Sequence, residues 1–144
     1  MKIVIAGAGD MGTHLAKMLS GNGHDLTVVD VESKALAEVG GLVDVVTVEG
    51  DTTQFSVLRK SGVRKCDLFI AVRSVENDNI LSAVMAKQLG AKKAIARVDS
   101  NEYLEPRTIA TTRYSKSSSS HPSSITVRPK SGEVNSKRNA TIDN

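Results

Sequence analysis

The chain has 144 residues, 40% hydrophobic and 24% charged, which is ordinary for a globular domain with its own core. With only 3% aromatic residues, the sequence predicts no platform for stacking nucleic-acid bases. No apolar run approaches the roughly 20 residues that span a bilayer and the start has no signal-peptide pattern, so we expect neither direct membrane insertion nor a signal peptide. The single cysteine, Cys66, excludes an intrachain disulfide. The net charge is +3, but residues 1–106 alone carry −2, so the folded part gives no support to nucleic-acid binding.

The first thirty residues have the pattern of a dinucleotide-binding βαβ unit. An apolar strand over Lys2–Ala6 leads directly into the glycine motif Gly7–Gly12. A helix over Thr13 to about Leu19 and a second strand, Leu26–Val29, follow, and the strand ends at Asp30. This order of strand, glycine turn, helix, strand and acid is the fingerprint of dinucleotide sites, although a glycine motif alone is also compatible with a turn that binds nothing.

Each residue of this motif has a predicted role. Gly7 allows the tight turn, Gly9 lets the backbone approach a pyrophosphate, and Gly12 lets the helix pack close to the sheet. Free N–H groups at the helix start then face the phosphates, and we expect the Asp10 carboxylate to point to solvent. Asp30 would accept hydrogen bonds from ribose hydroxyls and repel a 2′-phosphate, which favours NAD(H) or an adenosine nucleotide over NADP.

Helices and strands keep alternating along the rest of the chain. The predicted elements are a helix from Ser33 to Gly40 stopped by Gly40-Gly41, a strand over Asp44–Glu49, a helix from Thr53 to Ser61 ended by Gly62, a strand over Asp67–Val72, a helix capped by Ser74 and running to about Leu89, and a strand over Lys93–Val98. Five strands separated by four helices predict an α/β fold, a Rossmann-like doubly wound parallel sheet in the order 3-2-1-4-5.

Ligands of such a sheet bind at the carboxyl ends of the strands, where the strand order reverses. That rule selects the turn after Ala6, Asp30, Gly50–Thr52, Val72–Ser74 and Arg97. Two of these positions have an alternative interpretation. Asp51 either faces the pocket or forms a Gly-Asp-Thr turn or helix cap. Arg97 either binds a phosphate or pairs with Asp99 or Glu102.

Residues 107–144 differ from the rest in composition. They hold nine Ser, five Thr and a net charge of +5, without hydrophobic periodicity. Such a segment cannot offset its ordering entropy, so we predict that it is disordered. It is either a basic tail for anionic lipid or a partner, or an uninformative or non-native extension, and composition favours the second.

Five blocks occur in order over about residues 1–105: GAGDMGTHLAKML, VVD, EGDTT, DLFIAVRSVENDN and AKQLGAKKAIARVDSNEYL. Together they resemble the N-terminal domain of TrkA, of the class called KTN or RCK domains. The resemblance implies a nucleotide-binding domain over 1–106, followed by the tail over 107–144.

Such domains are regulatory subunits of Trk-type potassium uptake systems. The resemblance implies a ligand, NAD or NADH and in many members ATP or ADP, that is sensed and not turned over. It implies a potassium-translocating membrane subunit as partner, a homodimer or higher homo-oligomer, and a cytoplasmic position at the inner face of the cell membrane.

The resemblance also implies site residues. The phosphates would lie at Gly7, Gly9, Asp10, Met11 and Gly12, the ribose at Asp30, and the adenine beside Gly50, Asp51 and Thr52. The remaining members are Ala71 and Val72 in the lining, Asn79 nearby and Arg97 at the phosphates. Arg73 departs from the small hydroxyl residue usual in the family, and either attracts phosphate or lies in solvent. The family's further helix and strand are also replaced by the tail.

We expect no catalytic residue and no metal site. His14, His24 and Cys66 lack the spacing of a zinc site. The neighbouring Arg64 and Lys65 could lower the pKa of Cys66, but no partner base is evident. The alternative function is the cofactor-binding half of an NAD-dependent oxidoreductase, for which the tail is too short to supply a substrate domain.

Overall fold

The computed structural model describes residues 1–100, 112–115 and 123–127. The strands are β1 (Lys2–Ala6), β2 (Asp25–Asp30), β3 (Val46–Glu49), β4 (Leu68–Ala71), β5 (Lys93–Val98), β6 (Thr112–Ser115) and β7 (Ser123–Val127). The helices are α1 (Asp10–Ser20), α2 (Ser33–Leu42), α3 (Phe55–Lys60), the short 3₁₀ helix η1 (Val63–Lys65) and α4 (Glu76–Leu89). No helix of these described ranges is long and apolar enough to cross a membrane.

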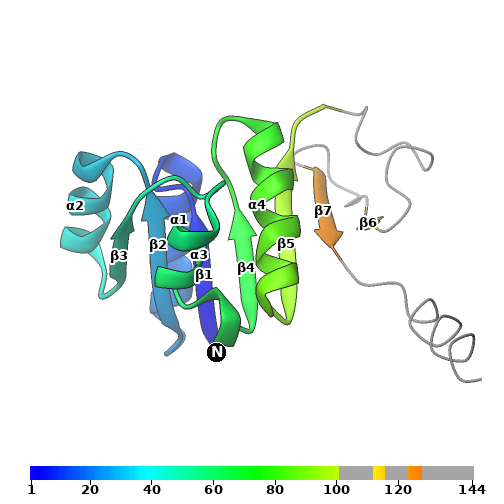
Figure 1. Ribbon diagram of the computed structural model, residues 1–144. Coiled ribbons are helices and arrows are strands. Elements are labelled where there is room, and N and C mark those ends of the chain that lie inside the picture. The colour runs from blue at the N-terminus through cyan, green and yellow to red at the C-terminus, as the bar shows by residue number, and fades with distance from the viewer. Residues whose placement is uncertain (101–111, 116–122, 128–144) are drawn as a thin grey trace, which may run out of the picture.

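One twisted sheet forms the centre of the molecule (Figure 1). Its strand order is β3-β2-β1-β4-β5-β7-β6, and β1 to β5 are parallel. The predicted Rossmann-like sheet in the order 3-2-1-4-5 is therefore confirmed. Because the order reverses between β1 and β4, the carboxyl ends of these two strands open onto the crevice where such sheets bind ligands.

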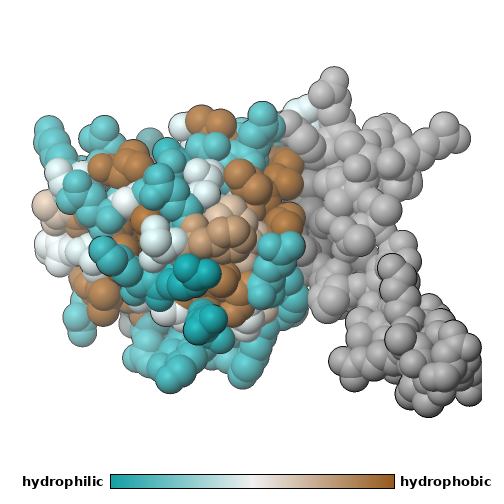
Figure 2. All heavy atoms as spheres, viewed as in Figure 1, coloured by the Kyte–Doolittle hydropathy of each residue, from teal (hydrophilic) through white to brown (hydrophobic). Residues whose placement is uncertain are grey.

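Helices cover both faces of this sheet, since successive side chains of each strand point to opposite faces. Ile3 and Ile5 of β1 pack with α1 and α2 in one apolar cluster. Val4 and Ala6 pack with α3 and α4 in the other. On the face that carries α3 and α4, hydrophilic side chains are interspersed with apolar ones (Figure 2). The inner strands are thus buried on both faces, which explains their nearly continuous apolar runs, whereas the edge strand β3 is mostly exposed.

Two predicted signals for helix ends, one stop and one cap, were wrong. Gly40 and Gly41 do not stop α2, which runs through both to Leu42. Glycine tolerates the helical conformation, and burial of Leu36 and Val39 holds this helix against the sheet. Ser74 does not cap α4 either, because the N-cap is Val75 and makes no side-chain hydrogen bond.

The region that is predicted as a disordered tail contains two short strands. β7 pairs antiparallel with β5, from Ala94 opposite Val127 to Val98 opposite Ser123, and β6 pairs antiparallel with β7. β7 contains three β-branched residues, which favour strands, and the edge of β5 supplies backbone partners. The rest of 107–144 lies outside the described residues, and with it the prediction of disorder there.

α1 packs directly on the turn that follows β1. Gly7 has φ +122°, a conformation that favours glycine. A Cβ on Gly12 would overlap the carbonyl oxygen of Gly7. The absence of a side chain at Gly12 therefore sets how closely the start of α1 approaches β1, as the sequence predicts.

We expect Gly12→Ala to lower the free energy of unfolding by at least about 2 kcal/mol, because the new methyl group must push backbone apart. Gly41→Ala is the matched control. It also lies within a helix, but its Cβ would meet nothing within 4 Å. That variant should gain up to about 1 kcal/mol from helix propensity. Urea unfolding of both variants measures these changes. A Gly12→Ala protein with the same free energy of unfolding as wild type would contradict the close contact between Gly12 and Gly7.

Asn79 ties the beginning of α4 to the ends of two strands. Its side chain is 1% exposed. Its Oδ1 accepts from the Arg73 backbone N–H at 2.8 Å, and its Nδ2 donates to the carbonyl oxygens of Arg73 at 2.8 Å and Arg97 at 3.1 Å. The Glu76 carboxylate accepts a further hydrogen bond from the backbone N–H of Asp99 at 2.9 Å. The first turn of α4 thus fixes the chain after both β4 and β5.

We expect Asn79→Asp to destabilise the fold by roughly 2–4 kcal/mol at pH 7.5, because a carboxylate would face two carbonyl oxygens. This unfavourable contact raises the carboxyl pKa in the folded state above its unfolded value. The folded variant then binds more protons, so its deficit relative to wild type should shrink as the pH falls toward 4. Urea unfolding of both proteins at the two pH values measures the difference. A loss of stability that does not depend on pH would contradict the hydrogen bonds from the Asn79 side chain to the two carbonyl oxygens.

Candidate functional site

A hollow of about 370 Å³ lies at the carboxyl ends of β1, β2 and β4. Its lining consists of Gly7, Gly9, Asp30, Val31, Glu32, Ala35, Val72, Arg73 and Ser74. A second hollow of about 450 Å³ adjoins it between α1 and α2, and the two share Gly9 and Ala35. Another hollow, of about 390 Å³, lies at the amino ends of β1 and β2, away from the switch point. The first hollow is the candidate site because it combines the glycine turn, the start of α1 and Asp30.

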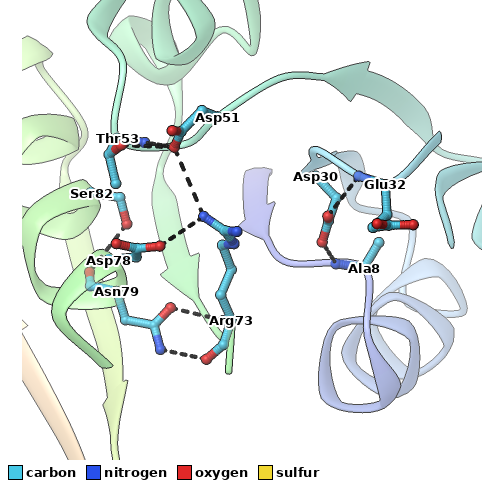
Figure 3. Close-up of polar contacts among 9 residues, drawn as sticks. All are labelled: Ala8, Asp30, Glu32, Asp51, Thr53, Arg73, Asp78, Asn79 and Ser82. Carbon is cyan, nitrogen blue, oxygen red and sulfur yellow. Dashed lines mark hydrogen bonds and ion pairs between the residues drawn. The ribbon is translucent and has the colours of Figure 1, made fainter. Parts of the chain in front are cut away.

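Asp30 connects the end of β2 to the glycine turn (Figure 3). It is 9% exposed. One carboxylate oxygen accepts from the Ala8 backbone N–H at 2.7 Å and the other from the Glu32 N–H at 3.0 Å. Each oxygen has a second lone pair, so the carboxylate can still accept from ribose hydroxyls. The predicted ribose acid therefore also holds the turn in place.

Gly9 leaves room where the phosphates are predicted to lie. It is the N-cap of α1, with φ −72° and no side-chain cap. A Cβ there would meet nothing within 4 Å, so the fold itself does not require glycine at this position. The open space and the backbone N–H groups of the first helical turn suit a diphosphate. Asp10, which follows, is exposed, as expected.

The loop after β3 is held by hydrogen bonds within itself. Oδ1 of Asp51 accepts from the backbone N–H of Thr53 at 2.8 Å and from its hydroxyl at 2.7 Å. These bonds hold the pKa of the Asp51 carboxyl below its ordinary value, and Arg73 adds a smaller effect. Asp51 thus forms the turn that was its alternative interpretation. A Cβ on Gly50 would collide with Val57. Thr52 is fully buried, and among the described residues its hydroxyl has no partner.

Not every predicted site residue reaches the hollow. Ala71 is fully buried in the core, and Met11 packs against the cluster beneath α1 and α2. Asn79 uses its side-chain amide to position backbone. Arg97 pairs with Asp99, at 3.2 Å from Nε and 3.4 Å from Nη2, which was its alternative partner. Of the predicted set, Gly7, Gly9, Asp30 and Val72 line the candidate site itself, and Asp10 lines the adjoining hollow.

The structure adds lining residues that the predicted set lacks. Val31, Glu32 and Ala35 come from the segment where the chain turns from β2 into α2. Their only sequence signal is that they closely follow Asp30. Arg73 does not lie in solvent, since its side chain is 19% exposed and pairs with Asp78 at 3.0 Å. Its position after β4 is the signal by which the carboxyl-end rule selected it together with Ser74, and both line the hollow.

The surroundings of Cys66 disfavour the thiolate that a nucleophile requires. Its side chain is 1% exposed. Burial raises the pKa of this thiol to about 11, and the neighbouring Asp67 contributes to the rise. The thiol is therefore protonated at neutral pH, despite the adjacent Arg64 and Lys65. In the part of the chain that the structure describes, no three His, Cys, Asp or Glu residues form a group that could hold a metal ion.

Solved structures with the same fold include nucleotide-binding proteins. The NAD(P)-binding domain of an exopolyphosphatase-related protein from Archaeoglobus fulgidus superposes with a TM-score of 0.62 at 19% identity, over 69% of this chain and 74% of that one. The GsuK channel bound to NAD superposes with a TM-score of 0.55 at 22% identity, over 62% of this chain and 16% of that one. Both likenesses concern the fold.

Sequence comparison identifies the family. The model of the TrkA-N domain matches residues 3–113. The Trk system potassium uptake protein TrkA homolog of Archaeoglobus fulgidus is 42% identical over 105 residues. This match covers 73% of the chain but spans only 24% of the length of that relative. The chain therefore belongs to the TrkA-N domain family.

Proposed function

We propose that this chain is a nucleotide-sensing domain that binds NAD(H), or ATP or ADP, and thereby regulates potassium uptake through a Trk-type membrane subunit. The observation that carries the proposal is the open space at Gly9, at the uncapped start of α1 and within the same hollow as Asp30. The family and the names of its potassium-uptake relatives support the regulatory role.

The nucleotide-binding unit is the domain over residues 1–106, and it works as a homodimer or higher homo-oligomer at the inner face of the cell membrane. The phosphates contact Gly7 and Gly9 of the turn and the backbone N–H groups of Asp10, Met11 and Gly12 in the first turn of α1, while the Met11 side chain stays packed in the core. Asp30 binds the adenosine ribose, and the loop Gly50–Thr52 lies beside the adenine. A solved GsuK channel that carries NAD supports NAD as one ligand of this fold in a channel protein.

The domain binds its ligand without turning it over. Asp30 accepts hydrogen bonds from two backbone N–H groups, so its role is to fix the turn and bind a ribose, and the proposal assigns it no proton transfer. Ligand binding acts on the membrane subunit because the domain has two conformations that bind the ligand with different affinities. A ligand with equal affinity for both conformations would not change their populations. Production of NADH from NAD and a panel of alcohols and hydroxy acids would instead support an oxidoreductase half.

We expect Gly9→Val to abolish binding of NAD and ADP in calorimetric titration and to leave the circular dichroism spectrum unchanged. A Cβ at this position would meet nothing within 4 Å, so the folded chain should accept the substitution, but the valine side chain would occupy the space of the diphosphate. Gly41→Ala, outside the lining of both hollows, is the control and should bind like wild type. Retained binding in Gly9→Val would place the diphosphate elsewhere.

We expect wild type to bind NAD at least about tenfold more tightly than NADP, because the Asp30 carboxylate repels the 2′-phosphate. Asp30→Asn removes the charge while keeping the size of the side chain. It should weaken NAD binding and narrow the ratio between the two ligands. Titration of each protein with both nucleotides measures that ratio, and an unchanged ratio in the variant would reject the ribose role.

A further inference from the structure

Arg73 lies across the glycine turn. Asn79 holds its backbone N–H and carbonyl oxygen directly after β4. A Cβ built on Gly7 would lie 3.2 Å from its Cγ, so the aliphatic stem passes close over the turn. The same side chain lines the candidate site. A cation is therefore fixed beside the space into which the start of α1 points.

Two carboxylates from different elements hold its guanidinium (Figure 3). Nη1 lies 3.0 Å from Oδ2 of Asp78, in the first turn of α4, and 3.8 Å from Oδ1 of Asp51, after β3. Both contacts use the same nitrogen. Asp51 Oδ1 is already bound by Thr53 at 2.8 and 2.7 Å, which leaves a longer ion pair with Arg73. The guanidinium has five N–H donors, so it can bind a further anion with the others.

The charge around the hollow is unfavourable for a diphosphate without this arginine. Asp30 and Glu32 line the hollow, and Asp51 and Asp78 contact Arg73. Arg73 is the one cation in the lining of this hollow among the described residues. A planar guanidinium binds phosphate oxygens in pairs, whereas Asp78 accepts a single bond at 3.0 Å and Asp51 forms only a longer ion pair at 3.8 Å. The arginine can therefore exchange a carboxylate for a phosphate with a gain.

We propose that Arg73 is a phosphate-binding residue of this site, which Asp78 and Asp51 hold when no ligand is bound and which a diphosphate draws away from them. The inference rests on the proposed nucleotide site and adds which contacts within the protein change when the ligand binds. Because Asp78 belongs to α4 and Asp51 to the loop that leads to α3, the exchange releases two elements on the same face of the sheet. The shared ligand chemistry is the diphosphate, whether it comes from NAD, ADP or free pyrophosphate.

The test compares ligands with and without phosphate on the full chain. Calorimetry measures the affinities for ADP, NAD and pyrophosphate, and an NMR titration measures the affinity for adenosine. In Arg73→Gln, ADP and NAD should bind at least about tenfold more weakly, while adenosine stays within about twofold of wild type. In Asp78→Asn, ADP should bind several-fold more tightly and adenosine unchanged. Arg59→Gln, the same charge change on α3, is the control and should match wild type for every ligand.

Pyrophosphate distinguishes the sources of the phosphate. Binding of pyrophosphate to wild type that Arg73→Gln abolishes would assign the contact to the diphosphate itself. Pyrophosphate that binds wild type and Arg73→Gln alike would overturn the inference.

Other outcomes overturn it as well. Equal loss of ADP and adenosine in Arg73→Gln, no loss, or tighter ADP binding would reject Arg73 as a phosphate ligand. Unchanged or weaker ADP binding in Asp78→Asn would reject the proposal that Asp78 and the diphosphate compete for the Arg73 guanidinium. If Arg73→Gln fails to fold, Arg73→Lys keeps the charge without the fork and should still weaken ADP at least about threefold, and unchanged affinity would reject the proposal. A wild-type chain that binds none of these ligands would refute the proposed function together with the inference, whereas binding that ignores Arg73 would refute the inference alone.

Discussion

The close approach of α1 to the turn after β1 is the constraint on which the site depends. It requires glycine at Gly12, where a methyl group would overlap the Gly7 carbonyl oxygen. It brings the uncapped first turn of α1 to the mouth of the hollow. The Asp30 carboxylate fixes the other side of the turn through the Ala8 N–H. A longer distance at this contact would widen the turn and move the helix start away from any ligand.

The five parallel strands could be predicted from the sequence, because local patterns mark each of them. Each of these strands is an apolar run, each helix follows a turn signal, and right-handed crossovers together with the dinucleotide fingerprint favour the order 3-2-1-4-5. The helix ends are less certain, as Gly40 and Gly41 show, because packing of buried neighbours overrides a weak local preference. β7 escaped prediction since a five-residue strand in a Ser-rich segment becomes evident only beside its partner β5.

The candidate site could be predicted only in part. The glycine turn and Asp30 have fixed spacing, so their place was predictable. The observed contacts of Asp51 and Arg97 were each one of two alternatives, and the partner of Arg73 was not named, because each charged side chain had several groups within reach and only the folded backbone decides among them. Arg73 pairs with Asp78, five residues later, only because α4 turns back over the end of β4. Asn79 looks like a ligand-facing polar residue in the sequence, yet its amide is committed to backbone groups.

The direction of β7 has a consequence for coupling across the domain. β7 runs antiparallel to β5, so Val127 lies opposite Ala94, near the amino end of β5, whereas the candidate hollow opens at the carboxyl ends of the parallel strands. The six residues of β5 separate the two edges by about 20 Å. Val127 therefore lies at the edge of the sheet opposite the hollow, and coupling between these two positions through the described residues passes along the strands or along α4.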